Sequence, residues 1–157
     1  KKIHKHFHGS DVEPPNNPRS WDHCLIVVET GGMRIVHWGD NRHNPPDEIW
    51  KALGQIDIAL LPVDASQHVM GYVHVEAITE RLKPRIVVPH HYYIWDVLQR
   101  QSTLQTAEAW VAEREVVERI AGPSRIYRIE EMDKLEAAVH YFGEHVNFDK
   151  TAWIEGS

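Results

Sequence analysis

Three apolar segments of the sequence are each followed within a few residues by aspartate or histidine, residue types that bind transition metals. Carboxylate oxygens and imidazole nitrogens are suitable ligands for Zn²⁺, Mn²⁺ or Fe. In an open α/β sheet, ligands bind beyond the carboxyl ends of the strands, so these residues predict a metal site at that edge. They are Asp40 and His43 after segment 33–38, Asp64, Ser66 and His68 after segment 56–63, and His90 and His91 after segment 85–89.

Asp40 is the residue in this set that is best suited to hold metal ions together. A carboxylate has two oxygens and can bridge two metal ions, whereas an imidazole has one free nitrogen. A plainer interpretation is also open, in which Asp40 and Asp64 only form turns and the histidines are solvated. The agreement of three strand ends favours the metal site.

Histidine also recurs at every second position near the start of the chain. His4, His6 and His8 fall on one face of a strand predicted over 3–8, because side chains alternate between the two faces of a strand. We expect one of them to face the metal site, His8 before His6, since His8 lies nearest the following loop. His37 is expected to pack inside its strand or to support a ligand.

The elements that must position these residues follow from apolar runs and from Gly and Pro breakers. Two β-branched runs around Gly31-Gly32 predict a hairpin, and the order strand, helix, strand over 56–89 predicts a β-α-β unit. The fold class is α/β with a mixed sheet, in a single domain over 1–157. The predicted strands are 3–8, 24–30, 33–38, 56–63, 85–89 and 125–129, and the predicted helices are 47–53, 72–82, 103–120 and 132–142.

Composition narrows the class of protein. The 157 residues carry 17 Lys and Arg against 23 Asp and Glu, a net charge of −6 that argues against a nucleic-acid partner. No apolar run reaches the roughly 18 residues of a membrane span, so we expect a soluble protein with no membrane partner. The single cysteine, Cys24, is expected to be inert and fits a reducing, cytoplasmic location.

Two stretches of the chain resemble a known family. The segment TGGMRIVHWGD, which ends at Asp40, is similar to the G-x-R-I-x-H-x-G-D segment of the metallo-β-lactamase superfamily. The later pieces IDIALLPV, EA and LKPRIVVPHHY resemble the branch of metal-dependent hydrolases that includes the ascorbate-6-phosphate lactonase-like proteins. The match covers roughly residues 3–92, and the ordered combination of pieces is specific.

The resemblance implies a layered αββα fold with a metal site at one edge of two packed sheets. It implies that Asp40 is the metal-bridging aspartate and the catalytic residue of this chain. It also implies that His91, which directly precedes Tyr92, is the last histidine ligand, and that His8 is a third ligand. His6, Asp64, His68 and His37 are secondary candidates. The implied cofactor is a divalent transition metal, first Zn²⁺ and otherwise Mn²⁺ or Fe, and the implied substrate is a small molecule.

The chain departs from the family in one respect. The H-x-H-x-D-H motif that supplies ligands to both metals does not occur in the sequence, and the chain starts at Lys1 without an initiator Met. We therefore expect the carboxyl-terminal half of the fold, a truncated domain with three of the usual ligands. This half binds metal weakly or not at all by itself.

Three functions remain open. In the first, the chain is part of a hydrolase in which metal-activated water attacks an ester, lactone or phosphoester once the missing half is supplied. In the second, it is a degenerate, non-catalytic binding module that forms an oligomer. In the third, its 12 histidines make a metal-binding surface. Half a sandwich leaves an apolar sheet face open, so we expect a homo-oligomer or a complementary amino-terminal half as partner.

Overall fold

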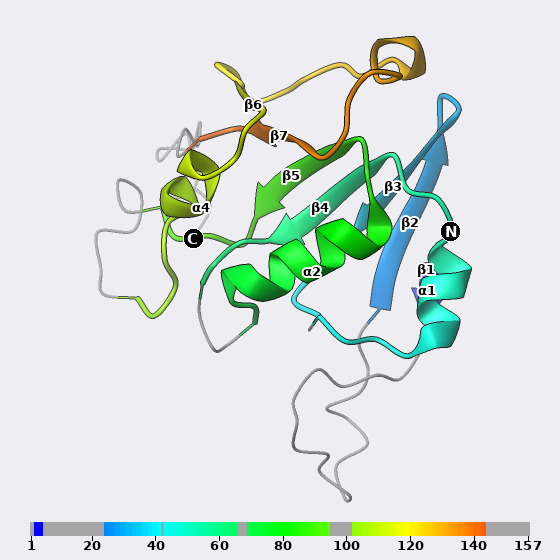
Figure 1. Cartoon of the computed structure of the whole chain (residues 1–157), viewed down its shortest axis with the longest axis horizontal. Coiled ribbons are helices and arrows are strands. Elements are labelled where there is room, and N and C mark those ends of the chain that lie inside the picture. The colour runs from blue at the N-terminus through cyan, green and yellow to red at the C-terminus, as the bar shows by residue number, and fades with distance from the viewer. Residues whose placement is uncertain (1, 5–23, 42, 66–68, 95–101, 144–157) are drawn as a thin grey trace, which may run out of the picture.

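The computed structural model describes residues 2–4, 24–41, 43–65, 69–94 and 102–143. Within these residues the chain forms a seven-stranded mixed sheet in the order β1-β2-β3-β4-β5-β7-β6 (Figure 1). The strands from β1 to β3 pair antiparallel, and those from β3 onward pair parallel. Their bounds are β1 Lys2–His4, β2 Cys24–Thr30, β3 Met33–His37, β4 Ile58–Pro62, β5 Ile86–His90, β6 Val117–Arg119 and β7 Ala138–Tyr141.

The first part of the sheet confirms the elements predicted around the site. β2 and β3 form the hairpin that turns at Gly31-Gly32, both of which have positive φ. β4 and β5 are parallel neighbours joined by helix α2 (Tyr72–Leu82), which is the predicted β-α-β unit. Because β3, β4 and β5 run in the same direction, their carboxyl ends meet at one edge of the sheet.

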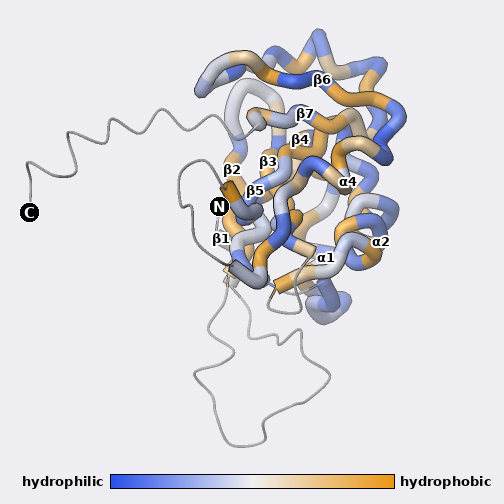
Figure 2. The backbone as a smooth tube through the Cα atoms, turned by 90° about the vertical axis from the view of Figure 1, so that its left-hand side faces the viewer, coloured by the Kyte–Doolittle hydropathy of each residue, from blue (hydrophilic) through white to orange (hydrophobic). Residues whose placement is uncertain are grey.

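One face of the sheet is covered by helices. These are α1 (Asp47–Leu53), α2 and the short α4 (Glu108–Ala112), which lie on one side of the strands in Figure 2. Their buried side chains, such as Leu53, Ile78 and Trp110, join Val36 and Leu61 of the strands in the main core. Figure 2 shows the orange, hydrophobic strands inside and mostly blue and pale segments outside. The buried side chains of α2 are three and four residues apart, so they form the apolar stripe along one side that is typical of a surface helix.

The opposite face of the sheet is covered over part of its area. Met132, beside the short 3₁₀ helix Ile129–Glu131, packs against Ile58 and Ile86 in a second, smaller core. On β2 the same face carries Ile26 and Val28, each 46% exposed. Apolar side chains on this face are therefore only partly removed from water within the described part of the chain.

The prediction of a helix over 103–120 is wrong. The helix is limited to α4, and the chain then enters β6, where Val117 pairs with Val139. The Val116 carbonyl also accepts a hydrogen bond from the Val139 N–H at 2.9 Å. Sheet pairing with a distant strand therefore overrides the helical pattern of the segment.

The predictions for 125–129 and 132–142 are also wrong. Most of 125–129 is irregular, with the 3₁₀ helix beginning at Ile129, and the second segment ends in β7. All four residues of β7 are buried because it lies between β5 and β6. A helix with one apolar stripe does not bury four consecutive residues. His140 accordingly lies on this strand and not on a helix.

At the amino terminus, β1 confirms only the first part of the strand predicted over 3–8. Its residues Lys2–His4 pair antiparallel with β2 at the edge of the sheet. The rest of that strand, with His6 and His8, lies outside the described residues, as does His68. None of the helices in the described ranges has the length and apolarity needed to cross a bilayer.

Candidate functional site

The three neighbouring strands β3, β4 and β5 each lead into a turn that contains a left-handed residue. Gly39 follows β3 with φ 64°, Ala65 follows β4 with φ 49°, and His91 follows β5 with φ 54°. A positive φ is easy for glycine and costly for Ala or His, which adopt it when the surrounding structure requires it. Strained backbone of this kind concentrates at functional sites, and here it marks the edge where the sequence places its metal-type residues.

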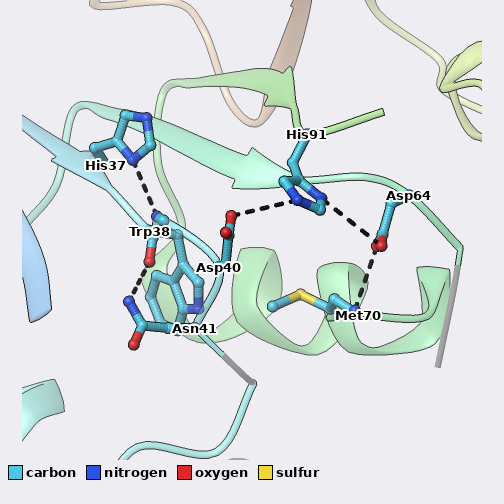
Figure 3. Close-up of polar contacts among 8 residues, drawn as sticks. His37, Trp38, Asp40, Asn41, Asp64, Met70 and His91 are labelled. Atoms are coloured by element: carbon cyan, nitrogen blue, oxygen red, sulfur yellow. Dashed lines mark hydrogen bonds and ion pairs between the residues drawn. The ribbon is translucent and has the colours of Figure 1, made fainter. Parts of the chain in front are cut away.

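His91 lies between two carboxylates from the other two strand ends (Figure 3). Its Nε2 atom is 3.5 Å from Oδ1 of Asp40, and its Nδ1 atom is 3.8 Å from Oδ2 of Asp64. The structure thus brings together three of the residues predicted from the sequence: Asp40, Asp64 and His91.

The two carboxylates differ sharply in exposure. The Asp40 side chain is 61% exposed, whereas that of Asp64 is fully buried. Oδ1 of Asp64 accepts a hydrogen bond from the Met70 backbone N–H at 3.3 Å. Burial raises the pKa of the Tyr72 hydroxyl, and the charges of Asp64 and Glu113 add to this effect. Asp40 is therefore the carboxylate that a substrate or a metal ion from solvent can reach.

The spacing of Asp40 and His91 fits a metal ion held between them. Two ligand atoms at about 2.1 Å from a tetrahedral Zn²⁺ lie about 3.4 Å apart, close to the 3.5 Å observed between Oδ1 and Nε2. In the described ranges, no set of three or more His, Cys, Asp or Glu side chains is arranged to hold a metal ion. Asp40 and His91 therefore have the spacing of two metal ligands, and no third such side chain joins them among the described residues.

His37 and His90 lie together near this edge. Their ring centroids are 4.5 Å apart, and Nδ1 of His37 accepts a hydrogen bond from the Gly39 N–H at 3.0 Å. A neutral His37 with an acceptor at Nδ1 carries its proton on Nε2, which leaves neither nitrogen open for a metal. Burial, followed by the nearby His37 and His91, lowers the pKa of His90 to about 4, so His90 is neutral at pH 7.

Two features of the site have no clear pattern in the sequence. Asn41 is buried, and its Nδ2 donates hydrogen bonds to the backbone carbonyls of Cys24, at 3.1 Å, and Trp38. These two hydrogen bonds fix the turn that carries Asp40. In the sequence, the one sign of this role is that Asn41 directly follows Asp40. His43 and His74 stack with their centroids 3.7 Å apart and their planes nearly parallel, although they come from distant parts of the sequence.

Comparison with known proteins identifies the class to which this chain belongs. Residues 3–91, more than half of the chain, match the model of a family described as a beta-lactamase superfamily domain. The chain belongs to the beta-lactamase superfamily.

Several of its relatives are named UPF0173 metal-dependent hydrolases. The protein of Thermococcus onnurineus is 41% identical over 73 residues, which is 46% of this chain and 32% of that protein. The protein of Desulforamulus reducens is 27% identical over 104 residues, which is 65% of this chain and 45% of that protein. The chain therefore spans between about a third and a half of the length of these curated relatives.

A solved structure has the same fold. It is a crystal structure from Thermotoga maritima, described as that of a member of the metallo-beta-lactamase superfamily. The TM-score is 0.67 at 18% identity, and the match covers 90% of this chain and 63% of that chain. This confirms the predicted fold class, a mixed α/β sheet with helices of the metallo-β-lactamase type.

Proposed function

We propose that this chain supplies Asp40 and His91 to the metal site of a hydrolase that acts on an ester, lactone or phosphoester. The observation that carries the proposal is the 3.5 Å approach of Asp40 Oδ1 to His91 Nε2 at the joint edge of three strands. The names of the relatives support a metal-dependent hydrolase. When bound, a divalent metal activates water at neutral pH and polarises the bond under attack.

The two side chains have different tasks in this proposal. Asp40 offers one oxygen toward His91 and, being exposed, can use the other toward a second metal ion or toward water. His91 offers Nε2 as a neutral nitrogen ligand, which suits Zn²⁺ first and also Mn²⁺ or Fe. Because catalytic zinc sites use three protein ligands, we propose His8 as the next ligand, with His6 and His68 as alternatives.

The remaining ligands are proposed to come from the amino-terminal half of the fold. The partly uncovered sheet face with Ile26 and Val28 is the surface on which a second sheet would pack. We propose that this half, on the same or another polypeptide, covers that face and brings the H-x-H-x-D-H residues to Asp40. A cytoplasmic location, which Cys24 favours as a single thiol, belongs to the same proposal.

The experiment is a Zn²⁺ titration of the chain and of four variants. Asp40→Ala and His91→Ala should each weaken Zn²⁺ binding at least tenfold, since each removes a ligand. Asp47→Ala removes an exposed aspartate on α1, and His140→Gln removes a buried histidine on β7, so both should bind like the parent. Unchanged affinity in both site variants would overturn the proposal.

The same samples separate the alternative functions. Sedimentation should show whether the chain forms a symmetric dimer, and a dimer that takes up no metal would favour a non-catalytic binding module. Uptake of more than two metal ions per chain would favour a histidine-rich metal-binding protein. Hydrolysis of nitrophenyl esters, lactones and phosphodiesters, measured with and without an added amino-terminal half from a related hydrolase, tests the reaction itself.

A further inference from the structure

Asp64, which follows β4, has a buried carboxylate. Its side chain is fully buried, and burying a carboxylate is costly unless polar groups surround it. Oδ1 receives the Met70 N–H, and the backbone carbonyl of Asp64 receives the Gln105 N–H at 2.8 Å. Contacts from two separate loops therefore hold this residue in one orientation, with Oδ2 facing His91.

The imidazole of His91 lies beside this carboxylate. Its Nδ1 atom is buried and makes no hydrogen bond to any residue that the structure describes, although Oδ2 of Asp64 is 3.8 Å away. A movement of about 1 Å brings this pair to hydrogen-bond distance, and hydrogen bonds of this kind often tighten only when a site is filled. His91 itself has a left-handed backbone conformation, with φ 54°.

We propose that Asp64 is the positioning residue of His91: it accepts a hydrogen bond from Nδ1–H and so leaves Nε2 unprotonated toward Asp40. A neutral imidazole carries its proton on one nitrogen only, and a metal can bind only the other. Carboxylates that fix the tautomer of a metal-binding histidine in this way contribute to metal affinity. The proposal rests on the function proposed above for its effect on metal binding, but the tautomer can be observed without any metal.

The geometry also separates this role from that of a metal ligand. Asp40 and Asp64 face different nitrogens of the same ring, so the imidazole lies between Asp64 and a metal ion bound at Nε2. Asp64 is buried, whereas Asp40 is open to solvent. Asp64 is thus a residue that acts through His91 and does not touch the metal.

The test compares Asp64→Asn with a matched control, Asp57→Asn. Asparagine has nearly the shape of aspartate, but it can donate its amide N–H to Nδ1 and so favours the proton on Nε2. Asp57 directly precedes β4, at the end of the strand opposite to Asp64. It is 7% exposed, and its carboxylate accepts a hydrogen bond from the Arg34 N–H at 2.7 Å. Its substitution measures the cost of altering a buried aspartate without touching His91.

The tautomer is read first, by ¹⁵N NMR of the imidazole nitrogens in the full chain at pH 8 without metal. We expect Nδ1–H in the parent and in Asp57→Asn, and a shift toward Nε2–H in Asp64→Asn. Zn²⁺ titration of the folded fraction of each sample should then show binding about 10 to 100 times weaker in Asp64→Asn, with Asp57→Asn close to the parent.

These measurements distinguish a failure of the positioning role of Asp64 from a failure of the proposed metal site. If the parent and Asp64→Asn have the same tautomer, the positioning role is overturned whether or not the chain binds metal. If the tautomer changes as expected but substitution of Asp40 and His91 leaves Zn²⁺ affinity unchanged, the metal site is wrong and the positioning role stands. If Asp64→Asn does not fold, Asp64→Ser is measured in its place. Serine also removes the carboxylate, and His91 should then show mixed tautomers.

Discussion

His91 lies close to Asp40 although β4 separates β3 and β5, the strands that these two residues follow. The 3.5 Å contact between Nε2 and Oδ1 therefore cannot come from strand pairing alone. It depends on the turns after β3 and β5, where Gly39 and His91 both have positive φ and bring the two side chains over the end of β4. The site is thus sensitive to the backbone of these turns as well as to its side chains.

The first prediction concerns the turn after β3. Gly39→Ala should lower the free energy of unfolding by about 1 kcal/mol or more, because alanine is strained at positive φ. The added Cβ would also lie 3.4 Å from Nδ2 of Asn41. Gly122→Ala is the control, since its Cβ would meet no atom of the described residues within 4 Å and its φ is not left-handed, so its effect should stay within about 0.5 kcal/mol. Urea unfolding measures both, and equal midpoints would contradict the argument.

The second prediction concerns Asn41, which holds the same turn with two hydrogen bonds from one amide nitrogen. Asn41→Asp should destabilise the chain by about 3 kcal/mol, because a buried carboxylate would face the Trp38 and Cys24 carbonyls without a proton to donate. Asn41→Ala leaves the carbonyls without their donor but adds no charge, so its loss should be smaller. Urea unfolding at pH 7 compares the two variants, and an Asp variant as stable as the Ala variant would show that the amide is not a donor here.

The sequence was sufficient to predict the part of the fold that positions the site. The apolar runs of β4 and β5 and the Gly and Pro residues around them are local signals, and they predicted the β-α-β unit with its helix Tyr72–Leu82. Because parallel strands share one edge, the same signals were enough to bring Asp40, Asp64 and His91 together.

The carboxyl-terminal third could not be predicted in this way. β7 is a strand because it pairs with the edge of β5, with Ile86 opposite Ala138, and nothing within its four residues indicates that pairing.

The role of Glu76, which belongs to the family resemblance, could not be predicted from the sequence either. It accepts a hydrogen bond from Nε1 of Trp110 at 2.6 Å and pairs with Arg114, so it joins α2 to α4.

The difference between Asp40 and Asp64 was not predictable either. Both residues follow strands in the sequence, but exposure separates them, and exposure depends on the packing of the loops around Asp64. The sequence therefore predicted which residues meet, while the structure showed which nitrogen of His91 faces each carboxylate.

The last prediction concerns stability against pH and rests on two histidines, His140, which is buried, and His90, which is partly buried. Burial lowers the pKa of His140, which Glu118 partly offsets, and burial likewise lowers that of His90 to about 4. In the unfolded chain both pKa values return to about 6.5, so at lower pH the unfolded state binds protons that the folded state excludes. The stabilising effect is therefore complete above about pH 6.5 and is lost as the pH falls toward the lowered values.

His140→Gln isolates one of the two contributions. His140 contacts the Tyr127 hydroxyl at 3.2 Å and the Glu118 carboxylate at 3.5 Å, and glutamine retains a polar group there without titrating. Urea unfolding between pH 8 and pH 5.5 should show a smaller loss of stability in the variant than in the parent. Any constant difference caused by changed packing is measured at pH 8, where His140 is neutral in both states, and is subtracted. Parallel pH curves for parent and variant would mean that His140 takes up its proton as readily in the folded chain as in the unfolded one, which its burial between β5 and β6 argues against.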